Sequence, residues 1–225
     1  MLNPQLNVAV LHEAYARHGA LSIQNVLRPE VAEQVLDALL KLDWALEIND
    51  YSSRPRFRIL LRELSCQNNL PQAIEELAHG LDTSKLFYLR LCVEDSQFAD
   101  PILKQFADYL GSEPFLAMMR AITGKAEVTH TWIEATCYDK GCFLGGHRDD
   151  HHPDNAVAFV FNFTRHWQLD WGGLLMLLLS NQSPTIVPPL WNSLSMFTVP
   201  LDHLVSCVSP AATAKRYSIT GWLRR

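Results

Sequence analysis

Residues 138–149 read YDKGCFLGGHRD, and the stretch closes on a histidine and an aspartate that are two positions apart. On an extended strand, side chains at positions i and i+2 project from the same face. His147 and Asp149 are therefore predicted to point toward one metal ion, and Gly145 and Gly146 let the backbone approach that ion closely. We expect a glycine-containing loop to deliver both ligands at the mouth of a β-barrel, where small-molecule and metal sites commonly lie.

A third ligand is expected from His203, which opens a β-rich segment over residues 203–208. Two histidines and one carboxylate form the facial triad of non-haem Fe(II) oxygenases, which leaves coordination positions open. The pattern needs support, because nine histidines and 24 acidic residues in 225 positions give roughly one His-x-acid match by chance. Taken singly, His147 fits an ordinary loop histidine and His203 a core or surface one. The competing match HPD, residues 152–154, favours a turn because of its central proline.

Arg216 adds a fourth polar position, in the alternating strand RYSITGW at residues 216–222. An inward arginine in a largely apolar barrel needs an anion to offset its desolvation. Its fixed fork of donors matches a carboxylate, either that of a ligand or that of an internal Asp or Glu. The arginine therefore predicts a carboxylate-binding pocket or an internal ion pair.

The composition describes a globular chain. At 225 residues, 48% apolar and 19% charged, it is long enough for one domain with a substantial core and too apolar to be disordered. The net charge of -5 and the lack of a basic run with interleaved aromatics argue against nucleic-acid binding. The sequence has neither a signal-like start nor an apolar run that could span a bilayer, so we expect a cytoplasmic protein without a membrane partner. Its charge is compatible with a monomer and with a dimer.

The five cysteines are odd in number and scattered, at positions 66, 92, 137, 142 and 207. They have no Cys-x-x-Cys spacing, so the pattern indicates neither a disulfide framework nor a zinc knuckle. We expect reduced thiols that are mostly buried.

Helical signals dominate the first half of the chain. Apolar residues recur at helical spacing over residues 29–44, 100–110 and 112–124, and more weakly over residues 71–79. Residues 52–56, SSRPR, are expected to form a mobile surface loop. Residues 1–125 are therefore predicted to be helical support.

Strand signals take over after residue 124, where β-branched and aromatic residues alternate with polar ones. Strands are predicted at residues 128–138, 157–163, 174–179, 194–199, 203–208 and 216–223. Short strands that follow a helical half indicate an α+β fold, with an antiparallel sandwich or jelly roll over residues 126–225 and helices on one face. We expect residues 1–225 to form one domain.

Four motifs occur in a fixed order along the second half. They are Tyr138-x-x-Gly-x-Phe-Leu-x-x-His147-x-Asp149, WQLDWGGLL at residues 167–175, Pro200-x-x-His203, and RYSITGW at residues 216–222. In order and spacing the set resembles the prolyl-hydroxylase branch of the 2-oxoglutarate/Fe(II) dioxygenases. The resemblance is strongest from about residue 126 onward, while the helical half, including LRPEVA at residues 27–32, is compatible with it and less diagnostic.

This resemblance implies a double-stranded β-helix in which the metal triad holds Fe(II) and Arg216 pairs with the distal carboxylate of 2-oxoglutarate. The metal and catalytic residues would be His147, Asp149 and His203. The further co-substrate residues would be Tyr138, Asn162, Thr220 and Trp222. The family varies at the position matched to Asn162, and the two aromatics fit core packing equally well. Turn and core roles are expected for Trp167, Trp171, Gly172 and Gly173.

The implied activity is a hydroxylation in which O2 and 2-oxoglutarate give succinate and CO2, with no protein acid or base required. Ascorbate is a further candidate cofactor. The leading substrate is a prolyl residue in a protein or peptide, and the alternative is a free amino acid or small metabolite. Residues 52–56 and 151–155 are the candidate substrate contacts. Two other interpretations stay open: a non-catalytic barrel with structural zinc, and a ligand-binding jelly roll without metal.

Overall fold

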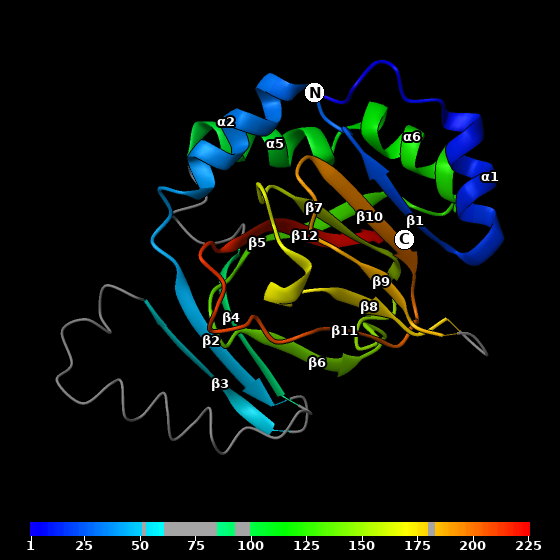
Figure 1. Cartoon of the computed structure of the whole chain (residues 1–225). Helices are drawn as coiled ribbons and strands as arrows, with labels where there is room; N and C mark the ends of the chain where they lie inside the picture. The colour runs from blue at the N-terminus through cyan, green and yellow to red at the C-terminus, as the bar shows by residue number, and fades with distance from the viewer. Residues whose placement is uncertain (51–52, 61–84, 93–99, 180–182) are drawn as a thin grey trace, which may run out of the picture.

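In the computed structural model the described residues are 1–50, 53–60, 85–92, 100–179 and 183–225, with side chains described outside residues 45–60 and 85–92. The strands form one 12-stranded antiparallel sheet in the order β1-β10-β7-β12-β5-β4-β6-β11-β8-β9, with β2 and β3 attached to β4. This sheet is folded over into two layers (Figure 1). One layer holds β1, β10, β7, β12 and β5, and the other holds β6, β11, β8 and β9. The α+β jelly roll predicted from the sequence is confirmed.

The strand bounds agree with the predicted positions in the second half of the chain. The strands are β1 Ala20–Gln24, β2 Ala45–Asp50, β3 Ser53–Leu60, β4 Lys85–Cys92, β5 His130–Tyr138, β6 Phe143–His147, β7 Asn155–Asn162, β8 Leu175–Leu177, β9 Thr185–Val187, β10 Ser193–Thr198, β11 His203–Val205 and β12 Arg216–Arg224. All six predicted strands are present. No clear alternation of apolar and polar residues marks β6, where two glycines interrupt the pattern, or β9.

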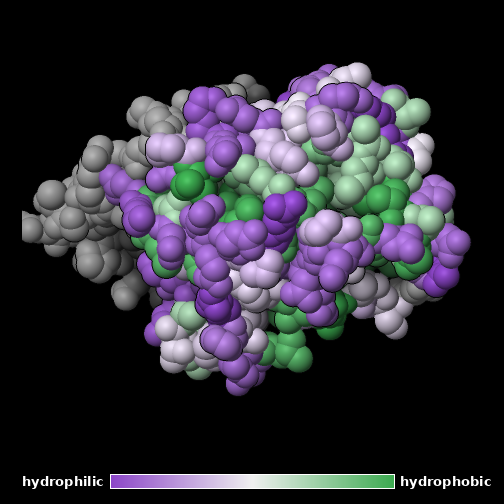
Figure 2. Space-filling view, turned by 90° about the horizontal axis from the view of Figure 1, so that it is seen from above, coloured by the Kyte–Doolittle hydropathy of each residue, from purple (hydrophilic) through white to green (hydrophobic). Residues whose placement is uncertain are grey.

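Within the described residues, four α-helices cover the outer face of the layer that holds β1, β10, β7, β12 and β5 (Figure 1). They are α1 Val8–His18, α2 Pro29–Leu39, α5 Pro101–Leu110 and α6 Glu113–Thr123. Phe106 of α5 packs edge-on against Phe161 of β7, with ring centroids 5.4 Å apart. Seen from above, this side of the molecule carries hydrophilic residues interspersed with hydrophobic ones (Figure 2). None of the described helices is long and apolar enough to cross a membrane.

The helix ends follow from local sequence signals. Asp100 caps α5 by accepting hydrogen bonds from the backbone N–H groups of Ile102 and Leu103. The unpredicted helix α1 begins after Asn7, whose side chain accepts from Val10 N, and ends at the left-handed Gly19. Only Tyr15 of α1 is buried, so its apolar stripe is weak. Helix α2 ends at Leu39, earlier than the predicted residue 44, and leads into strand β2.

The first half is not purely helical, so the prediction of helical support over residues 1–125 is wrong in part. Strand β1 pairs with β10, and β4 pairs with both β5 and β6, so strands from the first half extend the same sheet. The predicted surface loop is also wrong for residues 53–56, which belong to strand β3. Among the described residues β3 pairs only with β2, and such an edge position tolerates Pro55. Residue 52 and the weak helix at residues 71–79 lie outside the described residues.

Strand β12 is central to the site because it pairs with β5 on one side and β7 on the other. Its odd-numbered residue Ile219 lies opposite Phe161 and faces the helices, fully buried. Alternate residues of a strand face opposite sides, so the even-numbered positions face the interior of the roll. These positions are Arg216, Ser218, Thr220, Trp222 and Arg224.

Gly221 of β12 pairs with Ile133 of β5 and has no room for a side chain. A Cβ at this position would lie 2.0 Å from the carbonyl oxygen of Trp132. Backbone must therefore move in a Gly221→Ala variant, and we expect a loss of about 3 kcal/mol or more in the free energy of unfolding. Urea denaturation measures this. Gly111→Ala is the matched control, since its Cβ would meet only ordinary contacts at 3.7 Å and beyond; equal losses in the two variants would contradict the expectation.

Candidate metal centre

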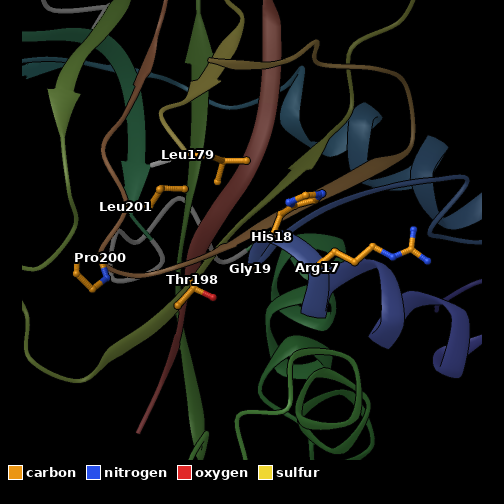
Figure 3. Close-up of a pocket in the computed structure, with 7 residues that line it drawn as sticks. All are labelled: Arg17, His18, Gly19, Leu179, Thr198, Pro200 and Leu201. Carbon is orange, nitrogen blue, oxygen red and sulfur yellow. The ribbon is translucent and has the colours of Figure 1, made fainter. Parts of the chain in front are cut away.

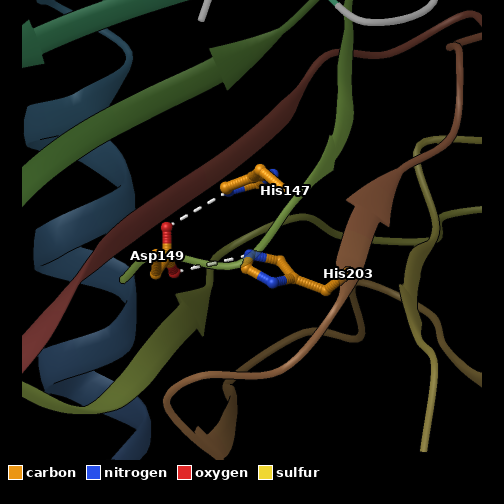
Figure 4. Close-up of side chains that lie close together, drawn as sticks. All are labelled: His147, Asp149 and His203. Carbon is orange, nitrogen blue, oxygen red and sulfur yellow. Dashed lines mark ion pairs between the residues drawn. The ribbon is translucent and has the colours of Figure 1, made fainter. Parts of the chain in front are cut away.

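His147, Asp149 and His203 come together between strands β6 and β11, where the two histidines lie directly opposite each other. His147 Nε2 is 3.2 Å from Asp149 Oδ1, and His203 Nε2 is 3.4 Å from Asp149 Oδ2 (Figure 4). Their candidate ligand atoms all lie within 4.8 Å of one another. Ligand atoms that bind one ion at about 2.1 Å and at right angles to each other lie about 3 Å apart. Two imidazole nitrogens and a carboxylate at these separations fit a ferrous ion.

Asp149 reaches this position by a route that the sequence did not predict. Strand β6 ends at His147, and Asp149 follows in a left-handed turn with φ 60. The alternation of an extended strand therefore does not explain why both side chains converge. Aspartate tolerates the left-handed region better than most residues. The Asn155 side chain holds the turn, because its amide donates to the backbone carbonyl of Asp149 at 2.9 Å.

Each histidine is oriented by a hydrogen bond on its far nitrogen. His147 Nδ1 donates to the carbonyl of Gly145 at 2.9 Å, and His203 Nδ1 donates to the carbonyl of Leu201 at 2.8 Å. A carbonyl only accepts, so the proton is on Nδ1 in both rings. The Nε2 lone pairs are then left to face the carboxylate, which is the tautomer that a metal ligand needs.

The three side chains sit in a buried environment that sets their charges. Burial raises the pKa of the Asp149 carboxyl, but the neighbouring His147 and His203 side chains hold that pKa below its ordinary value. The indole N–H of Trp222 acts in the same direction, although it makes no hydrogen bond within the described structure. Burial and the nearby His147 lower the pKa of His203 to about 4. At neutral pH the site therefore offers a carboxylate and a neutral His203 imidazole.

Arg216 begins strand β12 inside the roll, with its side chain 3% exposed. Its Nη1 donates to the carbonyl of Gly173 at 2.7 Å, and its Cζ lies 5.1 Å from the ring centroid of Tyr138. Its Nε is buried without a hydrogen-bond partner, and within the described part of the chain no carboxylate forms an ion pair with it. Burial lowers the pKa of Arg216, yet a guanidinium stays charged. A buried, unpaired arginine of this kind fits the carboxylate of a bound ligand.

The other residues predicted for the co-substrate pocket differ in their contacts. Tyr138 is buried directly opposite Arg216. The Asn162 side chain is held by Ser193 and Ser218 at 3.2 and 3.3 Å, and the Thr220 hydroxyl donates to the Phe159 carbonyl at 2.9 Å. Trp222 lies beside Asp149, six residues along β12 from Arg216.

The tryptophan–glycine segment before β8 forms a turn that also supports the site. Trp167 Nε1 donates to the Gly172 carbonyl at 2.9 Å, and the rings of Trp167 and Trp171 pack edge-on at 5.3 Å. Gly172 and Gly173 both have positive φ, and a Cβ on Gly172 would lie 2.1 Å from the Cys207 carbonyl oxygen. The carbonyl of Gly173 then fixes one end of Arg216.

The competing histidine motif lies at the surface. His152 Nδ1 and Asp154 Oδ2 are 3.7 Å apart and pair with each other, with side chains 41% and 52% exposed, in a turn between β6 and β7. Among the cysteines with described side chains, Cys137 and Cys142 are buried and Cys207 is exposed. None of these three forms a disulfide within the described residues.

The sequence does not predict a further group of contacting residues near Asp149. Asn155 Oδ1 accepts from Arg224 Nε at 2.9 Å, and the Arg224 guanidinium lies over the rings of Trp132 and Trp222 at 5.5 and 5.9 Å. These residues meet because Arg224 pairs with Asn155 in the β12–β7 ladder. No local sequence signal predicts this register, so only the fold brings these residues together.

A separate hollow of about 410 Å³ opens beside the end of α1. Figure 3 shows Leu179, Pro200 and Leu201 on one side of it, with Arg17 and His18 on the other. Leu201 connects the hollow to the triad, because its carbonyl holds His203 Nδ1. None of the three candidate metal ligands lines this hollow.

Residues 133–224 match the family model described as 2OG-Fe(II) oxygenase superfamily. The fold is similar to a prolyl-4-hydroxylase from Pseudomonas putida, with 16% identity, TM-score 0.65, and 97% of this chain and 99% of that chain covered. It is also similar to a Trichoplax adhaerens prolyl hydroxylase in complex with a hypoxia inducible factor oxygen degradation domain peptide fragment, with 15% identity, TM-score 0.66, and coverage of 96% and 88%. The epimerase SnoN from nogalamycin biosynthesis gives 14% identity, TM-score 0.60, and coverage of 95% and 80%. No curated protein matches the sequence significantly.

Proposed function

We propose that this chain, whose residues 133–224 match the family model described as 2OG-Fe(II) oxygenase superfamily, is a 2-oxoglutarate- and Fe(II)-dependent oxygenase that hydroxylates prolyl residues in a protein or peptide. The observation that carries the catalytic part is the combination of the triad with Arg216, which is buried and has no carboxylate partner in the described structure. The choice of a prolyl peptide is supported by fold similarity to a prolyl hydroxylase that was solved with a peptide.

His147, Asp149 and His203 would hold Fe(II), and Arg216 would hold the far carboxylate of 2-oxoglutarate. When bound, Fe(II) and the keto acid supply the O2-dependent oxidation of a C–H bond. The protein's own contribution is positional. Backbone carbonyls orient the two imidazoles, Asn155 fixes the turn that carries Asp149, and Gly173 and Tyr138 fix the guanidinium.

Arg216 also distinguishes catalysis from a structural metal site. A barrel that binds zinc for stability alone gains nothing from a buried cation without a partner, and burying such a charge costs several kcal/mol. A keto acid with a carboxylate at its far end gives that charge a partner. We therefore favour the enzyme over the non-catalytic barrel.

An anaerobic titration of the metal-free protein with Fe(II) and 2-oxoglutarate tests the catalytic part without knowledge of the substrate. We expect the visible charge-transfer band of an iron–keto acid chelate to develop at stoichiometric Fe(II). A folded protein that gives no band would contradict the proposed site. Hydroxyproline analysis of proline-containing peptides after aerobic turnover then tests the substrate class; succinate formation with free amino acids and not with peptides would replace the peptide by a small metabolite.

Asn155 is expected to act as a positioning residue for the metal. Its amide contacts Asp149 through the backbone carbonyl alone, so Asn155→Ala should loosen the ligand while leaving all three ligand side chains in place. Comparable outer partners of metal ligands are worth about 10- to 100-fold in affinity. Competition titration with a chromophoric chelator measures this loss for Fe(II) or Mn(II).

The control for Asn155 is Asn192, another buried asparagine, whose side chain binds backbone both as an acceptor and as a donor. Its side chain accepts from Leu27 N at 3.0 Å and donates to Leu27 O at 2.9 Å, away from the triad. Asn192→Ala should lower the free energy of unfolding and leave metal affinity unchanged. Equal metal affinities in the two variants would rule out the positioning role of Asn155.

A further inference from the structure

Arg224 stands out among the described arginines that are not fully exposed. Arg120 pairs with Glu113 and donates to the Val128 carbonyl, whereas Arg216 and Arg224, both on the inner side of β12, have no ion pair with any carboxylate in the described structure. Arg216 has a partner in the proposed function, namely 2-oxoglutarate. Arg224 has none there.

The Arg224 guanidinium is held in place before any ligand binds. Its Nε donates to Asn155 Oδ1 at 2.9 Å, and its Cζ lies over Trp132 at 5.5 Å and over Trp222 at 5.9 Å. The two indoles themselves pack with ring centroids 5.0 Å apart. Both Nη groups have no hydrogen-bond partner among the described residues. A fixed guanidinium with one free edge loses little conformational freedom on binding a carboxylate, so it is a prepared anion receptor.

The receptor adjoins the metal centre. Asn155 links the two directly, because the same side chain accepts from Arg224 and donates to the Asp149 carbonyl. Trp222, which stacks with Arg224, also faces the Asp149 carboxylate. A ligand that pairs with Arg224 would therefore lie next to the position where a C–H bond is oxidised.

The co-substrate cannot be that ligand while Arg216 holds it. Arg224 is eight residues further along β12, which corresponds to about 26 Å at about 3.3 Å per residue. A five-carbon keto acid is far shorter than this span. The anion that fits Arg224 must therefore come from the molecule that is hydroxylated.

We propose that Arg224 binds a carboxylate of the substrate, located beside the carbon that is hydroxylated. This proposal rests on the proposed function. The carboxylate has two chemical sources: an Asp or Glu side chain that flanks the target residue in a peptide, or the α-carboxylate of a free amino acid. The rings of Trp132 and Trp222 flank the guanidinium. Burial lowers the pKa of Arg224, and Asp154 acts in the opposite direction without reaching ion-pair distance, so among the described residues no carboxylate pairs with the guanidinium and the site accepts an external anion.

Pairs of ligands that differ only in the negative charge test the proposal. The first set contains proline-centred peptides with a single Asp at each flanking position, each matched by the Asn peptide. The second set is L-proline against L-prolinamide. Dissociation constants are measured by calorimetry with protein loaded with Mn(II) and 2-oxoglutarate under anaerobic conditions. We expect the acid to bind about 10- to 100-fold more tightly than its amide in at least one set, which also identifies the source of the carboxylate.

The preference should disappear in Arg224→Gln and be partly restored in Arg224→Lys, which keeps a charge without the fork. Arg225→Gln is the matched control: its neighbouring guanidinium is exposed and already contacts Glu127 and the Pro153 carbonyl, so the preference should persist. An acid preference that survives Arg224→Gln, or no preference in the wild type in either set, overturns the proposal.

Failure of the proposed function gives a different result. Arg224 contacts none of the three proposed iron ligands directly, so Arg224→Gln should still form the iron–keto acid band. A wild type without that band would contradict the oxygenase site, and the acid–amide comparison is then made on the metal-free protein. The hydrogen bond and ring contacts that hold Arg224 involve no metal, so the same preference is expected there.

Discussion

Asp149→Asn is expected to abolish the iron–keto acid chelate and to weaken Fe(II) binding by more than about 100-fold. Partners that only touch a ligand are worth about 10- to 100-fold, and Asp149 itself is the one anionic ligand of the proposed set. An amide keeps the shape of the side chain but removes the negative charge that attracts a divalent ion. Anaerobic absorbance titration of the variant, with Mn(II) binding as a second readout, measures the loss.

The adjacent Asp150 provides the control for this substitution. Asp150 comes directly after the His147-x-Asp149 motif, but its side chain is 57% exposed and pairs with Arg148 at 3.3 Å. Asp150→Asn should therefore bind Fe(II) and 2-oxoglutarate like the wild type. If Asp149→Asn retained wild-type metal affinity while both variants stayed folded by circular dichroism, the triad would not be the metal site.

Arg216→Gln has the second largest expected effect, and it falls on the keto acid alone. Hydrogen bonds to charged groups contribute about 1.5–3 kcal/mol, which corresponds to a rise of about 10- to 150-fold in the dissociation constant of 2-oxoglutarate. Affinity for the metal without the keto acid should not change, since Arg216 contacts Gly173 and Tyr138 and none of the ligands. Chelate absorbance at increasing 2-oxoglutarate separates the two quantities.

The neighbouring cation Lys215 is the control for Arg216. It is partly exposed and pairs with Asp139 at 2.8 Å, so Lys215→Gln should leave 2-oxoglutarate affinity unchanged. A second consequence concerns stability. Burying a charge without an ionic partner costs several kcal/mol, so Arg216→Met should not lower the free energy of unfolding of the ligand-free protein. Marked destabilisation of Arg216→Met, or equal keto acid affinity in Arg216→Gln, would contradict the role given to this arginine.

Strong local patterns allowed most of the chain from residue 100 onward to be predicted. The alternating stretch at residues 216–223 and the Pro and Gly boundaries of α5 and α6 agree with the observed elements within a few residues. The first half was harder, because its strands are stabilised by pairing with distant partners. Strand β4, for example, lies between β5 and β6, which come about fifty residues later.

The site shows the same division between local and distant information. The identities of the three convergent side chains follow from spacing and order, but the reason for their convergence does not. Asp149 projects correctly because of a left-handed turn, and that turn is held by Asn155 from the next strand. Arg224 was not singled out at all, since its significance depends on the β12–β7 register.

Strand β12 limits how the specificity of this protein could be altered. It is paired along both edges, and its odd-numbered residues Ile219 and Leu223 are fully buried, so the strand has no freedom to slide. A one-residue shift would exchange its inner and outer faces. An engineered cation for a substrate of different length can therefore be placed only at every second residue, in steps of about 6.6 Å. Between Arg216 and Arg224 the available positions are Ser218, Thr220 and Trp222, so substrate length is selectable in discrete increments and not continuously.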